Sequence, residues 1–349
     1  MNSFILQKQE EVIALAQFDI KDAVLKKCLL KEDETVITVP DGVTTIGKDA
    51  LCGLQSVIAV TLPESLKVIN DGAFYGCSSL TSVTLPGSVE RLGSCAFAQC
   101  SALNTIYLDN KLTEIGNSAF WGCTSLESID IPAGITKIGY NLFGSCLSLI
   151  SVSLPDTVTE LDERAFKECT SLACITLPDS LTKIGNMAFL NCHNLKSVNI
   201  PDRLESIGEK AFFMCESLHE LEIPDGIASV GGDAFSDCVS VTVRSTISGK
   251  PLYKAVTATD GSSAYNFILR NIWGKDGFDF AAQDNYFPAL QDENLQYAIA
   301  FSRLMYRVNL SASAEEHYLD FLHNNAETPC VTVLRRTVPS YSEYAGKTA

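Results

Sequence analysis

The hydrophobic positions of this chain recur every 23 residues from about residue 37 to residue 247. In one such period, residues 77–99, the apolar positions are Leu80, Val83, Leu85, Val89, Leu92, Ala96 and Phe97. The stretch from Leu80 to Leu85 ends in an alternation of apolar and polar residues at Val83, Thr84 and Leu85, which predicts a short strand with one buried face. Pro86 ends this strand, because proline cannot extend a hydrogen-bonded ladder.

The rest of the period predicts a second extended piece and a returning arc. Val89 to Leu92 form the second piece, and Gly93 is expected to supply the backbone freedom for a tight corner. Asn70 and Asp162 replace this glycine in two other periods, and both residue types tolerate unusual backbone angles. The arc then returns the chain to the next period, and a helical turn is one way to build it.

Two columns of identical residues follow the same period without a break. Eight cysteines stand 23 residues apart, at Cys77, Cys100, Cys123, Cys146, Cys169, Cys192, Cys215 and Cys238. A phenylalanine precedes each of them by three residues, from Phe74 to Phe235. A fixed period of this length predicts a solenoid of stacked coils, here about nine, with matching side chains superimposed in the core.

The repeat C-x-x-L-x-x-[VI]-x-[LI]-P-x-x-[LV]-x-x-[IL]-G-x-x-A-F resembles the BspA-like leucine-rich repeats, also called the Treponema pallidum type. The stretch CTSLESIDIPAGITKIGYNLFGS matches that pattern almost throughout, and the resemblance covers about 210 residues. It implies an α/β solenoid, a right-handed curved coil with a parallel sheet on its concave face. The roles it implies are protein–protein contact and adhesion, often at bacterial cell surfaces, and it brings no catalytic residues.

The sequence before the repeats predicts an N-terminal cap over residues 1–36. Ser3 to Gln17 has the apolar spacing of an amphipathic helix, and FDIKDAVLKKCLL predicts a hairpin. A helix lying on a membrane surface is the rival interpretation, but this segment has no basic face.

The repeat pattern fails after Val241, and residues 248–349 are expected to form a small α-rich domain. Plausible helices are Ala264–Trp273, Leu290–Val308 and Ala314–Asn325, the last preceded by a capping-box pattern at Ser313 and Glu316. The sequence indicates no function for this domain.

Charge and hydropathy narrow the class of protein. The chain of 349 residues has a formal net charge of −16, which argues against binding nucleic acid or anionic membranes. No apolar run approaches the roughly 20 residues that span a bilayer. The first residues lack a signal-peptide pattern, and the column cysteines are expected to be reduced packing thiols, so a cytoplasmic location is predicted. Secretion or surface display is the alternative, if the chain is a trimmed mature form.

No constellation in the sequence predicts catalysis, a metal or a cofactor. Cys174 and His219 are about two coils apart, roughly 10 Å, which is too far for a nucleophile–base pair. Cysteines spaced by 23 residues form a line, whereas zinc needs a tetrahedron. Phosphate-binding and nucleophile-elbow motifs are missing. We therefore predict that the chain is not an enzyme.

The outward positions of the first strand predict a binding surface. They are mostly small and hydroxylated in the middle coils, with charge in the late coils, and Tyr107 is a natural aromatic anchor. The candidate partner-binding residues are Tyr107, Glu127, Asp130, Lys196, His219, Glu220 and Glu222. They predict a non-catalytic scaffold for a protein partner, one that carries a basic segment. The alternatives are an adhesin for host matrix protein or glycan, and ordinary solvated side chains with no partner.

A second candidate surface is the arc that follows each phenylalanine. Its apolar residues are Tyr75, Trp121, Leu190, Phe213 and Met214. Exposed together they would form an apolar patch, but packing against neighbouring coils is the interpretation that we favour.

Overall fold

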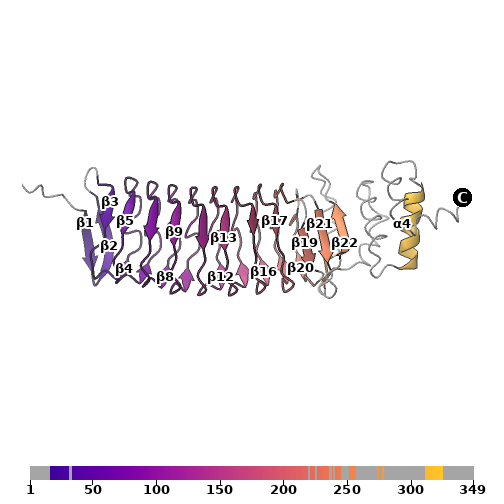
Figure 1. Cartoon of the computed structure of the whole chain (residues 1–349), viewed down its shortest axis with the longest axis horizontal. Helices are drawn as coiled ribbons and strands as arrows, with labels where there is room; N and C mark the ends of the chain where they lie inside the picture. Colours follow the sequence, from indigo (N-terminus) through magenta and orange to yellow (C-terminus); the bar gives the residue numbers. More distant parts are fainter. Residues whose placement is uncertain are drawn as a thin grey trace, which may run out of the picture.

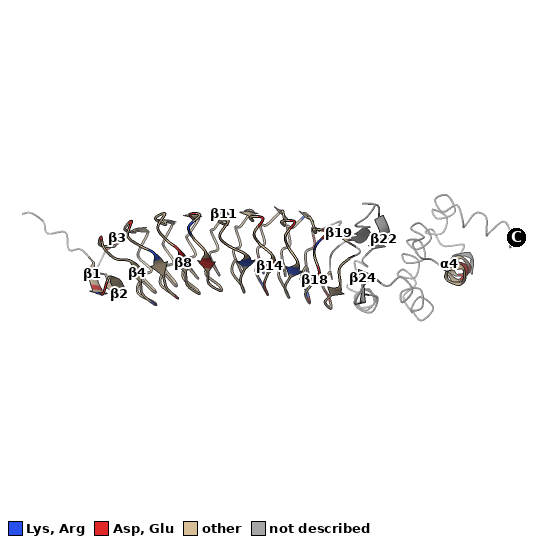
Figure 2. Cartoon of the chain, turned by 90° about the horizontal axis from the view of Figure 1, so that it is seen from below, with Lys and Arg blue, Asp and Glu red and all other residues tan. Residues whose placement is uncertain are grey.

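The structure is a computed structural model, and its main body is a stack of similar coils (Figure 1). It describes residues 16–30, 34–218, 221–224, 226–235, 238, 240–244, 251–256, 273–274, 277–278 and 311–324. Each repeat contributes one short strand to each of two strand series, which run along the length of the stack. In the two perpendicular views the stack is nearly straight (Figures 1 and 2).

The first strand series consists of the strands predicted before each proline. In chain order they are β3 (Val36–Thr38), β5 (Ala59–Thr61), β7 (Ser82–Thr84), β9 (Thr105–Tyr107), β11 (Ser128–Asp130), β13 (Ser151–Ser153), β15 (Cys174–Ile175), β17 (Ser197–Val198) and β19 (Leu221–Pro224). The strands that pair do so in parallel and 23 residues apart, as in Val83 with Ile106. The sequence prediction of a parallel, in-register solenoid is confirmed.

The second strand series comes from the extended piece that follows each proline. Its strands are β4 (Thr45–Ile46), β6 (Val68–Ile69), β8 (Arg91–Leu92), β10 (Glu114–Ile115), β12 (Lys137–Ile138), β14 (Glu160–Leu161), β16 (Lys183–Ile184), β18 (Ser206–Ile207) and β20 (Ser229–Val230). β4 to β10 pair in parallel within one sheet and β12 to β20 within another, at an interval of 23 residues, as in Ile184 with Ile207.

The phenylalanine and cysteine columns form the interior of the stack. Neighbouring phenylalanine rings from Phe74 to Phe235 lie 4.9–5.9 Å apart between centroids, with their planes within 17°. Each column thiol donates a hydrogen bond to a carbonyl 26 residues earlier, as Cys123 Sγ does to Phe97 O at 3.2 Å. A thiol therefore suits this position, because it fills a small apolar space and also pairs with a buried carbonyl.

The corner glycines have a different role from the one that the sequence predicted. Gly93 and Gly116 do not adopt positive φ, so unusual backbone freedom is not their function. A Cβ atom on Gly116 would lie 2.3 Å from Ser94 N and 2.5 Å from Gly93 C. These glycines are instead required because the backbones of neighbouring coils approach one another closely at the corner.

The returning arc is a succession of turns. Two residues in each arc, four positions apart, have left-handed backbone angles, as at Cys95 (φ 54°) and Gln99 (φ 61°). Such residues do not occur within a right-handed helix, so the helical turn considered for this arc is not formed. The coils of the described repeats are thus built from strands and turns.

Antiparallel strands lie at both ends of the stack. β1 (Gln17–Lys21) pairs antiparallel with β2 (Val24–Leu29), which pairs in parallel with β4. At the other end β21 (Ser240–Arg244) pairs in parallel with β19, and β22 (Pro251–Val256) pairs antiparallel with β21. The sheet therefore continues beyond residue 247, where the sequence placed the end of the solenoid.

The described C-terminal elements are short strands and one helix. They are β23 (Trp273–Gly274), β24 (Gly277–Phe278) and α4 (Ala312–Asn324). The helix is capped by Ser311, whose Oγ accepts a hydrogen bond from Ala314 N at 3.1 Å, and not by the predicted Ser313. The helix expected from Ser3 lies outside the described residues, apart from its end at Ala16 and Gln17, and Gln17 belongs to β1. Those expected at Ala264–Trp273 and Leu290–Val308 also lie outside them, apart from Trp273 in β23.

Candidate functional site on the first strand series

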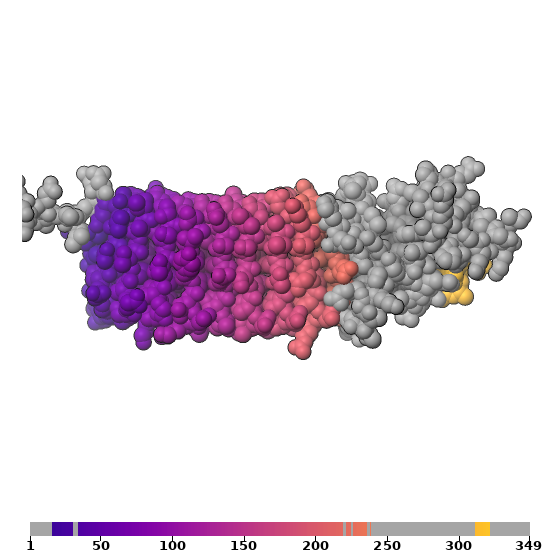
Figure 3. Space-filling view, viewed as in Figure 1, coloured from indigo at the N-terminus to yellow at the C-terminus, as the bar shows by residue number. Residues whose placement is uncertain are grey.

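The outer surface of the first strand series is the candidate site. We call it the strand face, and it comprises the exposed side chains of β3 to β19, the described residue before each strand, and Thr176 and Asn199, which follow the two-residue strands β15 and β17. The pleat alternates side chains, so Val83 is buried whereas Ser82 and Thr84 are exposed. Hydroxyl groups dominate its middle, at Thr84, Thr105, Ser128, Ser151, Ser153, Thr176 and Ser197. Figure 3 shows the described coils as a continuous rod. The small side chains of the strand face leave its backbone accessible to a partner.

Tyr107 stands out on this face, because 72% of its surface is exposed. It is the last residue of β9, and Asp130 holds the equivalent place in the next coil, on β11. Glu127 lies in the same coil as Asp130, at the opposite edge of the face, and is also exposed. The structure therefore places Tyr107 and Asp130 in one row on neighbouring coils, with Glu127 just beyond the other end of the strand that carries Asp130.

The predicted residues of the late coils are not part of this group. Lys196 is exposed just before β17, and Glu222 is exposed on β19, four coils beyond Asp130. About 19 Å separates those coils at a strand spacing of about 4.8 Å. His219 and Glu220 lie outside the described residues.

Three exposed apolar residues of the strand face, Val36, Ile58 and Ile150, were not selected from the sequence, and Ile150 is the one beside the acidic group. Ile150, just before β13, is 54% exposed and follows Glu127 by one coil in the same row. The period alone could have placed it there, but its exposure depends on what covers the face. It adds an apolar contact beside the acidic group.

The second strand series carries charges that neutralise one another. We call its exposed side chains the ladder face. Successive coils present Arg91, Glu114, Lys137, Glu160 and Lys183, whose signs alternate (Figure 2). Arg91 Nε lies 3.0 Å from Glu114 Oε2, and Lys137 Nζ lies 3.5 Å from Glu160 Oε2. Opposite charges on adjacent strands favour this stack, and the sequence analysis overlooked the pattern.

Asp162 strengthens the centre of the ladder face. Its Oδ2 atom lies 2.9 Å from Lys137 Nζ, and this hydrogen bond raises the pKa of Lys137. Partial burial opposes ionisation of Asp162, but the contact with Lys137 and a backbone hydrogen bond from Glu163 hold its pKa below the ordinary value. Both shifts favour the charged forms of Lys137 and Asp162.

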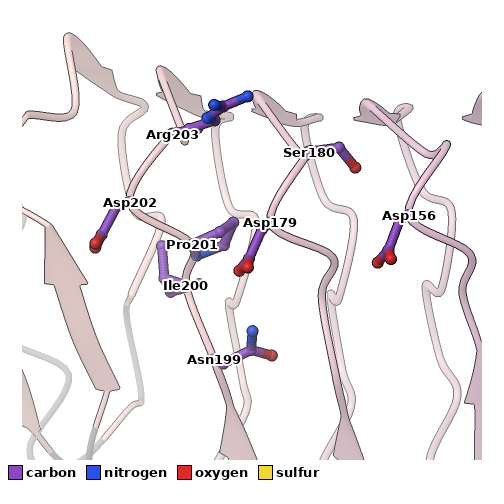
Figure 4. Close-up of a pocket in the computed structure, with 8 residues that line it drawn as sticks. All are labelled: Asp156, Asp179, Ser180, Asn199, Ile200, Pro201, Asp202 and Arg203. Carbon is purple, nitrogen blue, oxygen red and sulfur yellow. The ribbon is translucent and has the colours of Figure 1, made fainter.

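A cavity of about 660 Å³ opens at the edge of the strand face in the late coils (Figure 4). Its lining residues are Asp156, Asp179, Ser180, Asn199, Ile200, Pro201, Asp202 and Arg203. Three of them are the aspartates that follow a strand-ending proline in successive coils. The recurring Pro-Asp pair was visible in the sequence, but it did not predict a hollow.

Asn199 changes the pairing of the coils beside this cavity. Its Oδ1 accepts a hydrogen bond from Leu177 N at 2.7 Å, and its Nδ2 donates one to Leu177 O at 2.8 Å. In an earlier coil the equivalent amide, Ile131 N, instead bonds to a backbone oxygen, that of Ser153. An amide side chain therefore stands between two coils where backbone would otherwise pair.

The thiol chemistry of the core is suppressed. The twelve cysteines among the described residues are all free, and the eight of the column are buried. Burial raises the pKa of the Cys123 and Cys215 thiols to about 12, so they stay protonated at neutral pH. Cys192 bonds to Phe166 O in the core, whereas the neighbouring His193 approaches Glu216 at 3.8 Å. Within the described residues no group of three or more side chains could hold a metal ion.

The apolar arc is only partly exposed. Tyr75 is 38% and Met214 37% exposed, whereas Trp121, Leu190 and Phe213 are half-buried. They also fall into two separate groups: Leu190, Phe213 and Met214 come from two adjacent coils, three or more coils beyond Tyr75 and Trp121. The arc therefore offers a weaker contact surface than the strand face.

No helix in the part of the chain that the structure describes is long and apolar enough to cross a bilayer.

A parallel solenoid of about nine coils, with matching residues in columns, defines the chain as a repeat protein. The profile of the BspA type leucine rich repeat region matches residues 19–150 and 136–250, in six copies. These matches span well over half of the sequence, so the chain belongs to the BspA-type leucine-rich repeat family. Comparison with curated proteins gives no match.

Solved structures include similar solenoids. A leucine rich cell surface protein from Faecalibacterium prausnitzii is 28% identical with a TM-score of 0.51, over 66% of this chain and 74% of that one. A leucine-rich repeat protein from Bacteroides ovatus is 20% identical with a TM-score of 0.46, over 68% and 90%. The T. pallidum leucine rich repeat protein is 24% identical with a TM-score of 0.37, over 64% and 86%.

Proposed function

We propose that this chain is a non-catalytic scaffold that holds a protein partner on its strand face. The observation that carries the proposal is the group formed by Tyr107, Asp130 and Glu127. A tyrosine with 72% of its surface exposed stands one coil from two exposed carboxylates. None of the ion pairs in the described part of the chain involves either carboxylate.

The chemistry of this group suits a basic residue of the partner. A lysine or arginine can lie over the tyrosine ring while a nearby carboxylate receives its charge. Tyrosine is enriched among the residues that dominate binding energy at protein interfaces. The hydroxylated surface around it lets a partner approach closely, as Ser128 and Thr105 present short side chains.

The strand face is also built on a continuous buried core, which favours binding. The strands that carry Tyr107 and Asp130 bury Ile106 and Ile129 in the same core as the stacked phenylalanine rings. A preformed surface loses little conformational entropy when a partner binds.

Display on a cell surface is the second candidate, with the strand face acting as an adhesin for host matrix protein or glycan. It is supported by the relative from Faecalibacterium prausnitzii, which is described as a cell surface protein. Protease treatment of intact cells that express the full gene tests this location. Loss of the protein from intact cells supports display, and protection until lysis supports the cytoplasmic alternative.

Site-directed photocrosslinking tests the choice of face. A photoreactive amino acid replaces Ser128 on the strand face or Thr136 beside the ladder face, and partners captured in cells are identified by mass spectrometry. We expect a protein captured from position 128 and not from position 136. The double substitution Tyr107→Ala with Asp130→Lys should abolish this capture, whereas Lys137→Ala on the ladder face should leave it unchanged. Capture that survives the double substitution would contradict the proposal.

A further inference from the structure

We infer that the partner presents a short, extended, basic segment, which lies along the stack from Tyr107 to the cavity beside Asn199. This inference rests on the proposed function and specifies its ligand. Its path follows one edge of the strand face, along the row Tyr107, Asp130, Ser153, Thr176 and Asn199.

The first support is charge complementarity. Asp130, Asp156 and Asp179 are exposed, and none of the ion pairs between described residues includes them. The ladder face differs, because Arg91, Lys137 and Lys183 there each pair with an acidic neighbour. Unneutralised acid therefore collects along one edge of the strand face and its adjoining turns. Two exposed cations of the late coils lie near this path: Lys196 stands on the opposite edge of the face, and Arg203 lines the cavity itself.

The second support is the shape and lining of the cavity. Figure 4 shows Asp156 and Asp179 directed the same way from successive coils, with Arg203 directed away from them. Ile200 and Pro201 supply an apolar wall. A lysine or arginine side chain matches this combination, because its aliphatic stem packs on apolar groups while its charged end reaches carboxylates.

The third support is the surface between these two ends. The strand-face residues that separate Asp130 from Asn199 in this row are Ser153 and Thr176, both short and exposed. Four coil intervals separate Tyr107 from Asn199, which is about 19 Å at a spacing of about 4.8 Å. An extended chain covers that distance with about six residues, at roughly 3.3 Å each. A hexapeptide with cationic side chains is therefore the minimal ligand.

Fluorescence anisotropy with defined peptides tests the inference. The probe is a fluorescein-labelled hexapeptide of alternating arginine and valine, titrated with the full chain at low and moderate salt. A peptide of alternating glutamate and valine is the control ligand. We expect the basic peptide to bind, its affinity to fall with salt, and the acidic peptide not to bind.

Substitutions locate the binding. Tyr107→Ala and Asp179→Asn should each weaken the basic peptide by about five-fold, the effect of losing one charged or aromatic contact. The matched control is Glu114→Gln, which removes a carboxylate from the ladder face and should leave affinity unchanged. Circular dichroism of each variant establishes that the solenoid is intact.

Two results would overturn the inference. One is binding of the basic peptide that responds to Glu114→Gln as strongly as to Asp179→Asn, which would indicate nonspecific attraction to an acidic protein. The other is no binding of the basic peptide at low salt. If a partner is nevertheless captured from position 128, the strand face remains the binding surface and only the basic-segment inference fails.

Discussion

At the scale of single residues, the repeat is governed by how closely adjacent coils approach. The glycine column is the clearest case, because Gly93, Gly116 and Gly208 face backbone atoms of the preceding coil. Asn70 and Asp162 occupy the same position in two other coils. Glycine is therefore required only where neighbouring coils approach most closely. At Gly139 a Cβ atom would meet only the Asn117 side chain, at 2.9 Å.

The substitution Gly116→Ala tests this steric role. We expect it to lower the free energy of unfolding by about 2 kcal/mol, the range of overpacked cores, because the new methyl group collides with backbone. Chemical denaturation monitored by circular dichroism measures the change. The control is Gly226→Ala, whose Cβ would meet nothing within 4 Å and which should change stability little. Equal stability of Gly116→Ala and wild type would contradict this explanation.

The buried thiols predict loss of stability at alkaline pH. The pKa of the Cys123 thiol, ordinarily 9.0, is raised to about 12 by burial. Between pH 9 and pH 12 this thiol is ionised in the unfolded chain but still protonated in the folded protein. The free energy of unfolding is therefore unaffected by this thiol below pH 9 and falls as the pH rises from 9 to 12. In that pH range each such thiol lowers the free energy of unfolding by about 1.4 kcal/mol per pH unit.

Denaturation of wild type and Cys123→Ala at pH 8 and pH 10.5 measures this contribution. The variant starts from a lower stability at pH 8, because it leaves a small cavity, and it should lose less on going to pH 10.5. The same loss in both proteins would show that the Cys123 thiol is not the group that titrates.

At the scale of elements, the two strand series share one geometry but differ in charge. The second series has alternating signs on five successive coils, and each cation lies within 4 Å of an acidic neighbour. The described part of the first series has acidic side chains outside any ion pair, as at Asp130, together with an exposed tyrosine and many hydroxyl groups. The charges of the ladder face are thus paired within the chain, whereas the strand face retains negative charge that can bind a basic partner.

The ladder face predicts a small, salt-dependent effect of charge reversal. Glu114→Lys would place three cations in a row with Arg91 and Lys137, and we expect a loss of about 0.5–1 kcal/mol at low salt. Added salt should remove most of the loss, because these side chains are solvent-exposed. Thermal unfolding at two salt concentrations measures it. A loss that persists at high salt would indicate a packing defect rather than repulsion between charges.

At the scale of the whole molecule, the solenoid could be predicted because its period is unbroken. The columns from Phe74 to Phe235 and from Cys77 to Cys238 determine the register by their spacing alone. The role of Gly116 could not be predicted, since a close approach and a positive φ both select glycine. The cavity beside Asn199 also escaped prediction, because it depends on a side-chain amide that replaces backbone pairing. The placement of Tyr107 beside Asp130 followed directly from the period.

The central claim is that successive coils are stacked in register, and a distance measurement between spin labels tests it most directly. Labels at introduced cysteines replace Ser82 and Ser197 in one protein and Thr38 and Thr176 in another, with Cys52, Cys95, Cys174 and Cys330 changed to serine. The pairs span five and six coil intervals, so electron paramagnetic resonance should give mean distances near 24 Å and 29 Å, at about 4.8 Å per coil. Distances that do not increase by one strand spacing per coil would contradict the register on which both faces depend.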